Sequence, residues 1–318
     1  KKIITFLFFA LCFLAGNAQT LIGNQQPIQV KIASYGATQN ALLSLPDDYY
    51  TTDNVYPLII FLHGYGEIGS TTADLSKQIK QGLPLVISRG GKIQAVNPVD
   101  GKLYKFIVVS PQHWGWTTQP DAIERMLQEL PNIYRIDTNR VYITGLSAGG
   151  QGVIQSVTYS QALTNKIAAI VPMSPSAPDN ALLKRFTFFK ESKTGAWFFS
   201  GKSDPGNYTD NARRYSDSIN KYNPGASKMT LYEGGHCCWA NIYTPSYREG
   251  GMNIYEWMLT HTRNEVATPP EPDPVEDYEI RIGNAQDIKK IIVLMKDGGY
   301  REYDSTDMTI PNIKVQVQ

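Results

Sequence analysis

The sequence has few cysteines and histidines and almost no net charge. Its 318 residues include 3 Cys and 4 His, and 30 basic residues oppose 29 acidic ones, for a formal net charge of +1. So few cysteines give no disulfide framework, and no Cys or His spacing typical of a zinc site occurs. The balanced charge argues against a nucleic-acid partner. Phosphate-loop and dinucleotide fingerprints are also missing, so the sequence predicts neither metal nor cofactor.

The N-terminal apolar run is too short to span a bilayer comfortably. Lys1 and Lys2 precede apolar residues 3–15, and Gly16-Asn17-Ala18 offers small side chains around a cleavage point. This pattern predicts a secretory signal peptide at residues 1–18 and no membrane span in the mature chain. We therefore expect a secreted protein, with periplasm, cell surface and medium left open as destinations.

Removal of residues 1–18 would take Cys12 with it and leave two adjacent cysteines, Cys237 and Cys238. A disulfide between neighbours is possible but strained. The sequence therefore favours two reduced, partly buried thiols.

Apolar segments alternate with amphipathic ones through most of the chain. After a predicted hairpin at 28–33 and 41–45, strand-like runs occur at 55–62, 104–110, 141–144, 167–173, 195–200 and 228–232. Helical patterns fall between or after them, at 74–88, 120–130, 148–159, 208–222 and 252–261. This alternation predicts an α/β domain over residues 19–263, with a mostly parallel sheet and helices on both faces.

The last part of the chain has a different composition. Residues 264–277 are rich in proline and acidic residues, which is typical of an extended linker. Residues 278–318 then predict a small β segment, with strands at 291–295 and 300–303 around the turn Asp297-Gly298-Gly299. The segment is typical of a truncated piece of a further β domain.

The most informative motif is VYITGLSAGGQG at residues 141–152. A buried strand leads into Gly145-Leu146-Ser147-Ala148-Gly149, and a helix follows. This order is that of a nucleophile elbow, in which a sharp turn lifts the serine hydroxyl above the sheet. The alternative is a glycine-rich turn whose serine only caps a helix. The strand before and the helix after favour Ser147 as a nucleophile.

A serine nucleophile needs a base, which follows it in the chain order of elbow enzymes. Only His236 and His261 lie after Ser147. His261 ends a predicted helix, where a histidine commonly interacts with the helix dipole. His236 lies in a glycine-flanked loop after a strand and is the better candidate.

The orienting acid is expected between the serine and the histidine. Asp204 follows a buried strand and precedes His236, whereas Asp179 follows the wrong strand and Asp210 is expected inside a helix. Asp204 is therefore the predicted acid, although an exposed aspartate that begins a turn would look the same.

The negatively charged intermediate of acyl transfer needs hydrogen-bond donors. The backbone N–H groups of Ala148 and Tyr65 are the candidates, and His63 is expected to fix its loop without catalysing.

Three tryptophans, Trp114, Trp116 and Trp239, stand near strand ends, where each could line a substrate cleft or simply pack.

With these residues in place, the chain resembles α/β-hydrolase esterases of the carbohydrate esterase family 1 type. This type includes feruloyl and acetylxylan esterases, the polyhydroxybutyrate depolymerase-like group and a branch often labelled predicted peptidases. The resemblance covers most of residues 50–260 and is carried by six segments: FLHGYGEIG (61–69), VVSPQHWGW (108–116), DTNRVYITGLSAGG (137–150), WFFSGKSDP (197–205), EGGHCCW (233–239) and YEWML (255–259).

The resemblance implies the α/β-hydrolase fold, with Ser147, Asp204 and His236 as triad and Tyr65 and Ala148 as oxyanion donors. It also implies a secreted serine carboxylesterase acting on feruloyl or acetyl esters of plant cell-wall polysaccharide. A serine peptidase and a non-catalytic carbohydrate-binding protein on the same fold remain alternatives, and polyester is a further possible substrate. The cysteine pair after His236 departs from the usual pattern of the family.

Overall fold

The structure is a computed structural model that describes residues 20–32, 37–176 and 180–263, together with four strands beyond residue 277. The chain divides into two compact units, Lys1–Asn264 and Glu265–Gln318. The predicted signal peptide, the predicted linker and the turn at 297–299 lie outside the described residues. The two units are described separately.

The described strands of the first unit form an eight-stranded sheet in the order β1-β2-β6-β3-β7-β8-β9-β10. β1 and β2 are antiparallel to each other and β2 is antiparallel to β6, while the remaining neighbours run parallel. The strands are β1 (Gln26–Lys31), β2 (Thr38–Ser44), β3 (Tyr56–Leu62), β6 (Ile107–Pro111), β7 (Ile136–Leu146), β8 (Ala169–Met173), β9 (Gly195–Gly201) and β10 (Ser227–Tyr232). The expected mixed sheet with a leading hairpin is confirmed.

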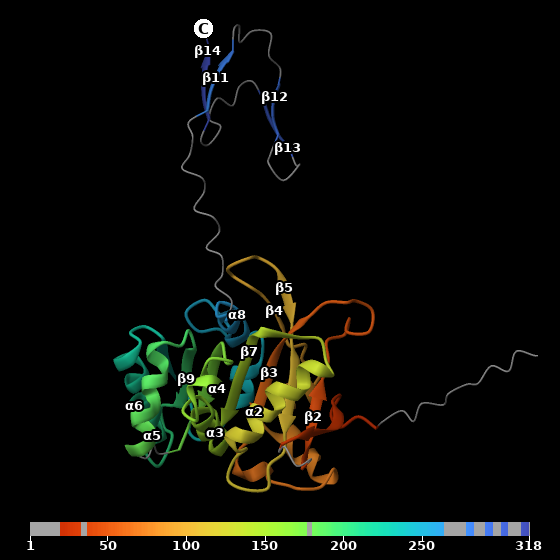
Figure 1. The fold of residues 1–318 in the computed structure, drawn as a ribbon, viewed down its shortest axis with the longest axis vertical. Helices are drawn as coiled ribbons and strands as arrows, with labels where there is room; N and C mark the ends of the chain where they lie inside the picture. The colour runs from red at the N-terminus through yellow and green to blue at the C-terminus, as the bar shows by residue number, and fades with distance from the viewer. Residues whose placement is uncertain are drawn as a thin grey trace, which may run out of the picture. The chain divides into compact units, whose positions relative to one another are not determined.

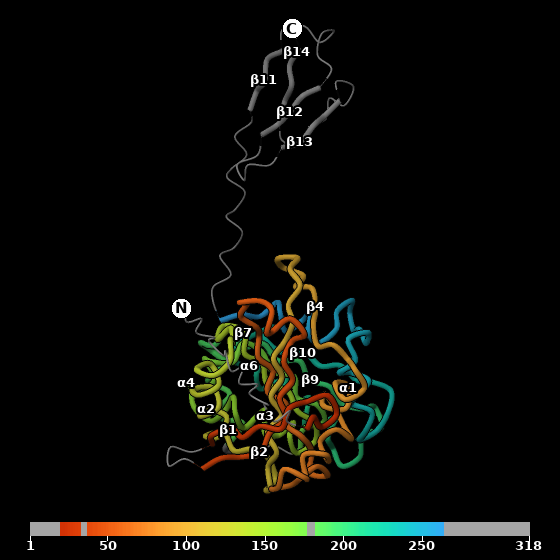
Figure 2. Tube along the Cα trace, turned by 90° about the vertical axis from the view of Figure 1, so that its right-hand side faces the viewer, coloured from red at the N-terminus to blue at the C-terminus, as the bar shows by residue number. Residues whose placement is uncertain are grey.

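Helices cover both faces of this sheet, which explains why β3 is apolar at every position (Figures 1 and 2). Leu58, Ile60 and Leu62 pack with one set of helices, while Ile59 and Phe61 pack with the other. The first set is α2 (Pro120–Glu129), α3 (Ala148–Val157) and α6 (Tyr208–Tyr222), and the second is α1 (Gly82–Ser88), α7 (Trp239–Tyr243) and α8 (Ile254–Leu259). A strand buried on both faces needs this continuous apolar run.

Several boundaries differ from those expected. The predicted strand at 104–110 is divided into β5 (Leu103–Lys105) and β6, and β5 forms a small antiparallel hairpin with β4 (Gln94–Val96), which was not predicted. The predicted helix at 74–88 is a 3₁₀ helix (Ala73–Lys80) followed by α1. Further short helices are α4 (Gln161–Thr164), α5 (Asn180–Lys184) and the 3₁₀ segments Tyr65–Glu67, Leu130–Asn132 and Arg185–Lys190.

In the second unit, β11 (Tyr278–Ile282) pairs in parallel with β14 (Ile313–Val317). β12 (Lys290–Leu294) pairs antiparallel with β13 (Tyr300–Asp304). The β character predicted for residues 278–318 is confirmed for these strands.

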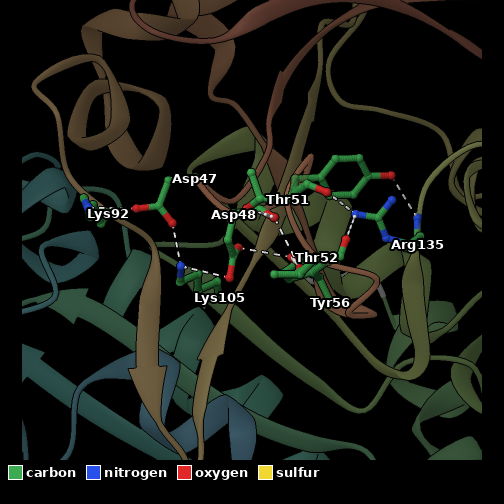
Figure 3. Close-up of polar contacts among 9 residues, drawn as sticks. Asp47, Asp48, Thr51, Thr52, Tyr56, Lys92, Lys105 and Arg135 are labelled. Carbon is green, nitrogen blue, oxygen red and sulfur yellow. Dashed lines mark hydrogen bonds and ion pairs between the residues drawn. The ribbon is translucent and has the colours of Figure 1, made fainter.

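A polar network closes the edge of the sheet at which the parallel strands begin, here called the amino edge (Figure 3). Lys105 Nζ lies 2.6 Å from Asp47 Oδ1 and 3.0 Å from Asp48 Oδ2. Arg135, directly before β7, donates from Nε to the carbonyl of Asn54 (3.0 Å) and from Nη2 to that of Thr52 (3.0 Å). The Arg135 guanidinium also lies 4.0 Å from the centre of the Tyr49 ring. The network therefore fixes the loop that joins β2 to β3.

Candidate active site

Ser147 stands between the last residue of β7 and the first residue of α3, at the edge where the parallel strands end, here called the carboxyl edge. Its φ of 53° and ψ of −118° lie in a region that L-residues rarely adopt. Such a backbone costs on the order of 1–3 kcal/mol and persists only where the surroundings hold it. The Ser147 N–H donates to the carbonyl of Met173 at 2.9 Å, so β8 holds the turn in place.

Two glycines of the motif let the backbone fold this tightly. A Cβ on Gly149 would lie 2.0 Å from the carbonyl oxygen of Leu62, and one on Gly145 would lie 2.7 Å from the same atom. Both distances are far below contact, so any side chain would push the end of β3 away. The glycines therefore bring the loop after β3 directly against the serine turn.

The three residues predicted as a triad come together across three strand ends. His236 Nε2 lies 2.8 Å from Ser147 Oγ, and His236 Nδ1 lies 2.8 Å from Asp204 Oδ1. An ionised carboxylate only accepts, so Nδ1–H donates to Asp204 and Nε2 accepts from the serine hydroxyl. This is the arrangement of serine, histidine and carboxylate that nucleophilic catalysis by a serine requires.

The rejected candidates lie elsewhere. His261 follows α8 and its Nδ1 contacts the carbonyl of Trp257 at 3.0 Å. Asp210 lies in α6, where Arg213 Nη1 donates to its Oδ1 at 2.8 Å. Asp179 lies outside the described residues.

Asp204 is an ionised group in a closed environment, because its side chain is 0% exposed. Burial opposes ionisation, but hydrogen bonds from His236, Ser174 and Ser200 outweigh it and hold the pKa of this carboxyl below its usual range. The Ser200 hydroxyl donates to Asp204 Oδ2 at 3.1 Å. Asp204 is therefore charged and fixed in position.

Two aromatic rings enclose the His236 imidazole. The Tyr208 ring lies 4.1 Å from it, centre to centre, and the Trp239 ring meets it edge-on at 4.9 Å. Trp239 is only 5% exposed, and its indole N–H donates to Ser174 Oγ at 3.2 Å. This tryptophan thus packs against the base and does not lie open to solvent.

The sequence analysis did not identify Ser174, Ser200 or Tyr208. Ser174 directly follows β8 and Ser200 is the last but one residue of β9. Strand-end position was therefore an available signal for both serines, as it was for the triad. Tyr208 begins α6 and carried no comparable signal.

A pair of histidines fixes the loop that follows β3. His63 Nδ1 lies 2.7 Å from the carbonyl of Gly64, and its Nε2 lies 3.1 Å from the backbone nitrogen of His113. Nδ1 must donate to the carbonyl and Nε2 must accept from the N–H, so His63 is neutral. The two imidazoles stack at 3.6 Å, centre to centre. Burial lowers the pKa of His63 to about 4, and burial together with the neighbouring His63 lowers that of His113 to about 2.

Tyr65 and Ala148 each begin a helical turn, where the first N–H has no partner within the helix. In the part of the chain that the structure describes, neither N–H donates to another group. Gly64 packs against the serine turn, since a Cβ there would lie 2.8 Å from Leu146 Cδ1. Two unused donors therefore stand on neighbouring loops beside Ser147.

The two other predicted tryptophans are exposed, Trp114 by 76% and Trp116 by 46%. The Trp116 ring lies 5.5 Å from that of Tyr65, and its indole N–H donates to Gln151 Oε1 at 2.6 Å. Gln151 lies in the first turn of α3, so Trp116 stands beside the serine turn. Trp114 lines a separate pocket together with residues of β1, β2 and the loop after β6.

The expectation for the cysteines was wrong in both respects. Cys237 and Cys238 are joined by a disulfide and both are exposed. Cys238 has a left-handed backbone (φ 70°) and precedes α7, and the Tyr232 hydroxyl donates to the carbonyl of Cys237 at 2.9 Å. The expectation weighed the strain of a bond between neighbours and did not foresee the left-handed turn at Cys238. The bond closes the loop directly after His236.

Among the described residues, no group of three or more His, Cys, Asp and Glu side chains is arranged to hold a metal ion. In the same part of the chain, no helix combines the length and apolar character needed to cross a bilayer.

The chain matches no protein-family model and no curated protein. Solved structures do match. A thermostable esterase superposes with a TM-score of 0.55 at 23% identity, over 76% of this chain and 64% of the esterase. The chain therefore spans less than two thirds of that protein's length. A ferulic acid esterase matches with a TM-score of 0.50 at 16% identity, over 74% of this chain and 99% of the esterase.

An S-formylglutathione hydrolase from Staphylococcus aureus matches with a TM-score of 0.51 at 16% identity, over 74% of this chain and 96% of the hydrolase. At these identities the likeness shows the fold, and the first unit has the α/β-hydrolase fold. The fold predicted from the sequence is confirmed.

Proposed function

We propose that this chain is a secreted serine carboxylesterase that releases acyl groups from plant cell-wall polysaccharide through an acyl-enzyme. The observation that carries the proposal is the continuous line of two 2.8 Å hydrogen bonds from Ser147 through His236 to Asp204. A buried carboxylate, an imidazole between that carboxylate and the serine, and a hydroxyl at hydrogen-bond distance are the parts that acyl transfer needs.

In the acylation step, Ser147 Oγ attacks the ester carbonyl and His236 Nε2 takes the hydroxyl proton. The imidazolium that forms is stabilised by Asp204, which keeps its charge because three hydrogen bonds lower its pKa. The carbonyl oxygen becomes negative and accepts hydrogen bonds from the N–H groups of Tyr65 and Ala148. His236 then gives its proton to the departing alcohol.

In the deacylation step, a water molecule replaces the alcohol. His236 takes a proton from this water, and the resulting hydroxide attacks the acyl group on Ser147. Collapse of the second intermediate returns the proton to Ser147 Oγ and releases the acid. The triad and the two N–H donors thus serve both halves of the reaction.

Two features support a location outside the cell. The segment at 1–18 has the pattern of a secretory signal, and a Cys237–Cys238 disulfide suits an oxidising compartment. The names of the matched structures include esterases, which supports the reaction class by fold analogy only.

The test is hydrolysis of p-nitrophenyl acetate and methyl ferulate by the mature protein and its Ser147→Ala variant. We expect turnover of both esters and a loss on the order of a millionfold in kcat in the variant. A Ser203→Ala variant is the matched control, because Ser203 is an exposed serine next to Asp204. Peptide substrates cleaved as fast as these esters, or equal rates for Ser147→Ala and the mature protein, would refute the proposal.

A further inference from the structure

A shallow polar groove lies on the strands at one end of the sheet, away from the triad. It consists of two pockets of about 270 Å³ and 220 Å³, which adjoin because both include Gln29 and Asn40. We call the two together the amide groove, lined by Pro27, Ile28, Gln29, Ile32, Thr38, Gln39, Asn40, Ser70, Thr72, Gln112 and Trp114. Nothing in the proposed mechanism uses it.

The described lining of the amide groove contains amide, hydroxyl and apolar side chains but no charged one. The pocket at the amino edge differs, since Asp47, Lys92 and Lys105 line it. A groove without charged side chains offers an ionic ligand no countercharge to offset its desolvation. It suits a neutral ligand that forms many hydrogen bonds.

The amides of the groove retain unused hydrogen-bonding groups. Gln39 Nε2 donates to the carbonyl of Gln112, and Asn40 Nδ2 donates to the carbonyl of Ser70 at 3.0 Å. Gln29 Oε1 accepts from Thr38 Oγ1 at 3.4 Å. Within the described residues, Gln29 Nε2, Gln39 Oε1 and Asn40 Oδ1 have no partner. One donor and two acceptors close together match sugar hydroxyls, each of which both donates and accepts.

Trp114 adds a flat apolar surface to this polar groove. It is 76% exposed, and within the described residues its ring stacks on no other ring. An exposed indole leaves a large apolar area in water without a partner. The C–H face of a pyranose ring would cover that area, while its hydroxyls reach the neighbouring amides.

The groove and the triad share the carboxyl edge of the sheet. β2 runs antiparallel, so its first residues pair with the end of β6, as in the pair Ala41 and Pro111. Trp114 is two residues from Trp116, a backbone separation of at most roughly 7 Å. Trp116 is bonded to Gln151, whose own N–H donates to the carbonyl of Ser147 at 3.1 Å. The groove and Ser147 therefore lie along the same edge of the sheet, with β6 and β3 between β2 and β7.

We propose that the amide groove binds the uncharged main chain of a polysaccharide, with Trp114 stacked on one sugar ring and Gln29 and Asn40 bonded to its hydroxyls. The inference rests on the proposed esterase function and specifies its substrate: the ester is carried by a neutral glycan, whose next sugars occupy the groove. Trp114 is a specificity residue for the polymer and Trp116 belongs to the acyl site.

The binding test uses the full Ser147→Ala chain, which holds ligand without consuming it. Calorimetry measures its affinity for xylohexaose, a neutral oligosaccharide without esters. We expect Trp114→Ala to weaken binding about tenfold, the upper range for loss of one stacked ring. Gln29→Ala should weaken it about threefold, since it removes one hydrogen bond to a neutral group. Tyr50→Ala is the control, because Tyr50 is 79% exposed but belongs to the loop of the amino edge.

Two outcomes overturn the inference: no detectable binding of xylohexaose, or equal losses for Trp114→Ala and Tyr50→Ala. Binding of oligogalacturonate as tight as that of xylohexaose would also overturn it, because an uncharged groove should prefer the neutral chain. Hydrolysis of p-nitrophenyl acetate by the unsubstituted protein tests the esterase function alone. If p-nitrophenyl acetate is not hydrolysed while xylohexaose binds at Trp114, the proposed esterase function is wrong and the proposal that the amide groove binds a neutral glycan is retained.

In a chain that keeps Ser147, kinetics distinguish the proposed esterase function from the proposed binding of polysaccharide in the amide groove. The ratio of kcat/KM on an acetylated xylan to kcat/KM on p-nitrophenyl acetate should fall about tenfold in Trp114→Ala, mainly through KM for the polymer. An unchanged ratio, with both esters hydrolysed, would retain the esterase and reject the groove.

Discussion

The two edges of one sheet each carry a polar network that contains buried or exposed carboxylates. The two networks differ in the groups that are bonded to those carboxylates. At the amino edge, Lys105 lies between the carboxylates of Asp47 and Asp48, and Lys92 adds a second cation to Asp47 (Figure 3). At the carboxyl edge, the Asp204 carboxylate faces a histidine and two serines, with no lysine or arginine bonded to it in the described structure. Charges are paired at the first edge, whereas at the second edge a single carboxylate is held by neutral donors, and in the proposed mechanism its histidine takes up a proton.

The pKa values alone do not separate these edges. The pKa of Asp47 is lowered to about 2 by its two lysines, and that of Asp204 is lowered as well. Exposure does separate them, because the Asp47 side chain is 51% exposed and that of Asp204 is 0% exposed. A buried charge held by neutral donors is therefore the better sign of a reactive site than a shifted pKa.

The largest expected effect separates the two carboxylates. Asp204→Asn should lower kcat by about 10⁴, since an amide in that place stabilises the wrong tautomer of His236. Asp47→Asn should leave kcat unchanged because Asp47 belongs to a surface ion-pair cluster. Ester hydrolysis by both variants checks the contrast, and comparable losses in the two would show that it is false.

Acid should destabilise the carboxyl edge through its buried histidines. The pKa of His63 is about 4 in the folded chain, against 6.5 for an ordinary histidine. The unfolded chain therefore binds the extra proton first as the pH falls, so stability is full above 6.5 and is lost progressively between 6.5 and 4. The full loss from this one group is about 3 kcal/mol.

Urea unfolding at pH 7 and pH 4.5 checks this effect. His63→Gln is the comparison variant, since glutamine keeps one donor and one acceptor without titrating. Its stability should change less between the two pH values than that of the unsubstituted protein. The same pH dependence in both proteins would exclude His63 as the cause.

At the amino edge, Arg135→Ala should lower the free energy of unfolding by about 2 kcal/mol, because it leaves the loop carbonyls of Asn54 and Thr52 without their donor. The variant should keep its kcat at temperatures where it is folded. Arg213→Ala is the control, since Arg213 makes only an exposed pair with Asp210 in α6. A lost kcat with unchanged stability would contradict the structural role of this edge.

The smallest effect concerns a positioning residue. Ser174→Ala removes one donor from Asp204, and we expect kcat to fall about tenfold while KM stays the same. The carboxylate with fewer donors is more basic, so the acid limb of the pH profile should move to higher pH. A variant that loses stability but keeps both kcat and the pH profile would make Ser174 a packing residue only.

The positions of residues directly after predicted strands explain how much of the candidate site could be predicted from the sequence. Ser147, Asp204 and His236 each follow a recognisable apolar run, and in a parallel sheet such positions meet at one edge whatever the details of packing. The apolar runs also predicted the sheet and its two helical layers. Boundaries were less accurate, as at β5, where Phe106 separates two strands that one continuous pattern had joined.

The remaining features depend on contacts between distant segments. The hydrogen bond from Trp239 to Ser174 spans 65 residues, so no local pattern showed that this tryptophan is buried. The Cys237–Cys238 bond depends on the left-handed turn at Cys238, which a tendency for cysteine pairs does not reveal. The separate surroundings of Trp114 and Trp116 likewise follow from loop geometry, although the two residues are nearly adjacent in sequence.

The backbone of Ser147 has a consequence for evolution of this chain. Its positive φ suits glycine better than serine, so a mutation to glycine would relieve backbone strain and remove the nucleophile together. Selection for thermal robustness alone would therefore favour loss of the hydroxyl at this position. If Ser147 is the nucleophile that we propose, the strained turn marks a trade-off between backbone stability and chemistry at this position.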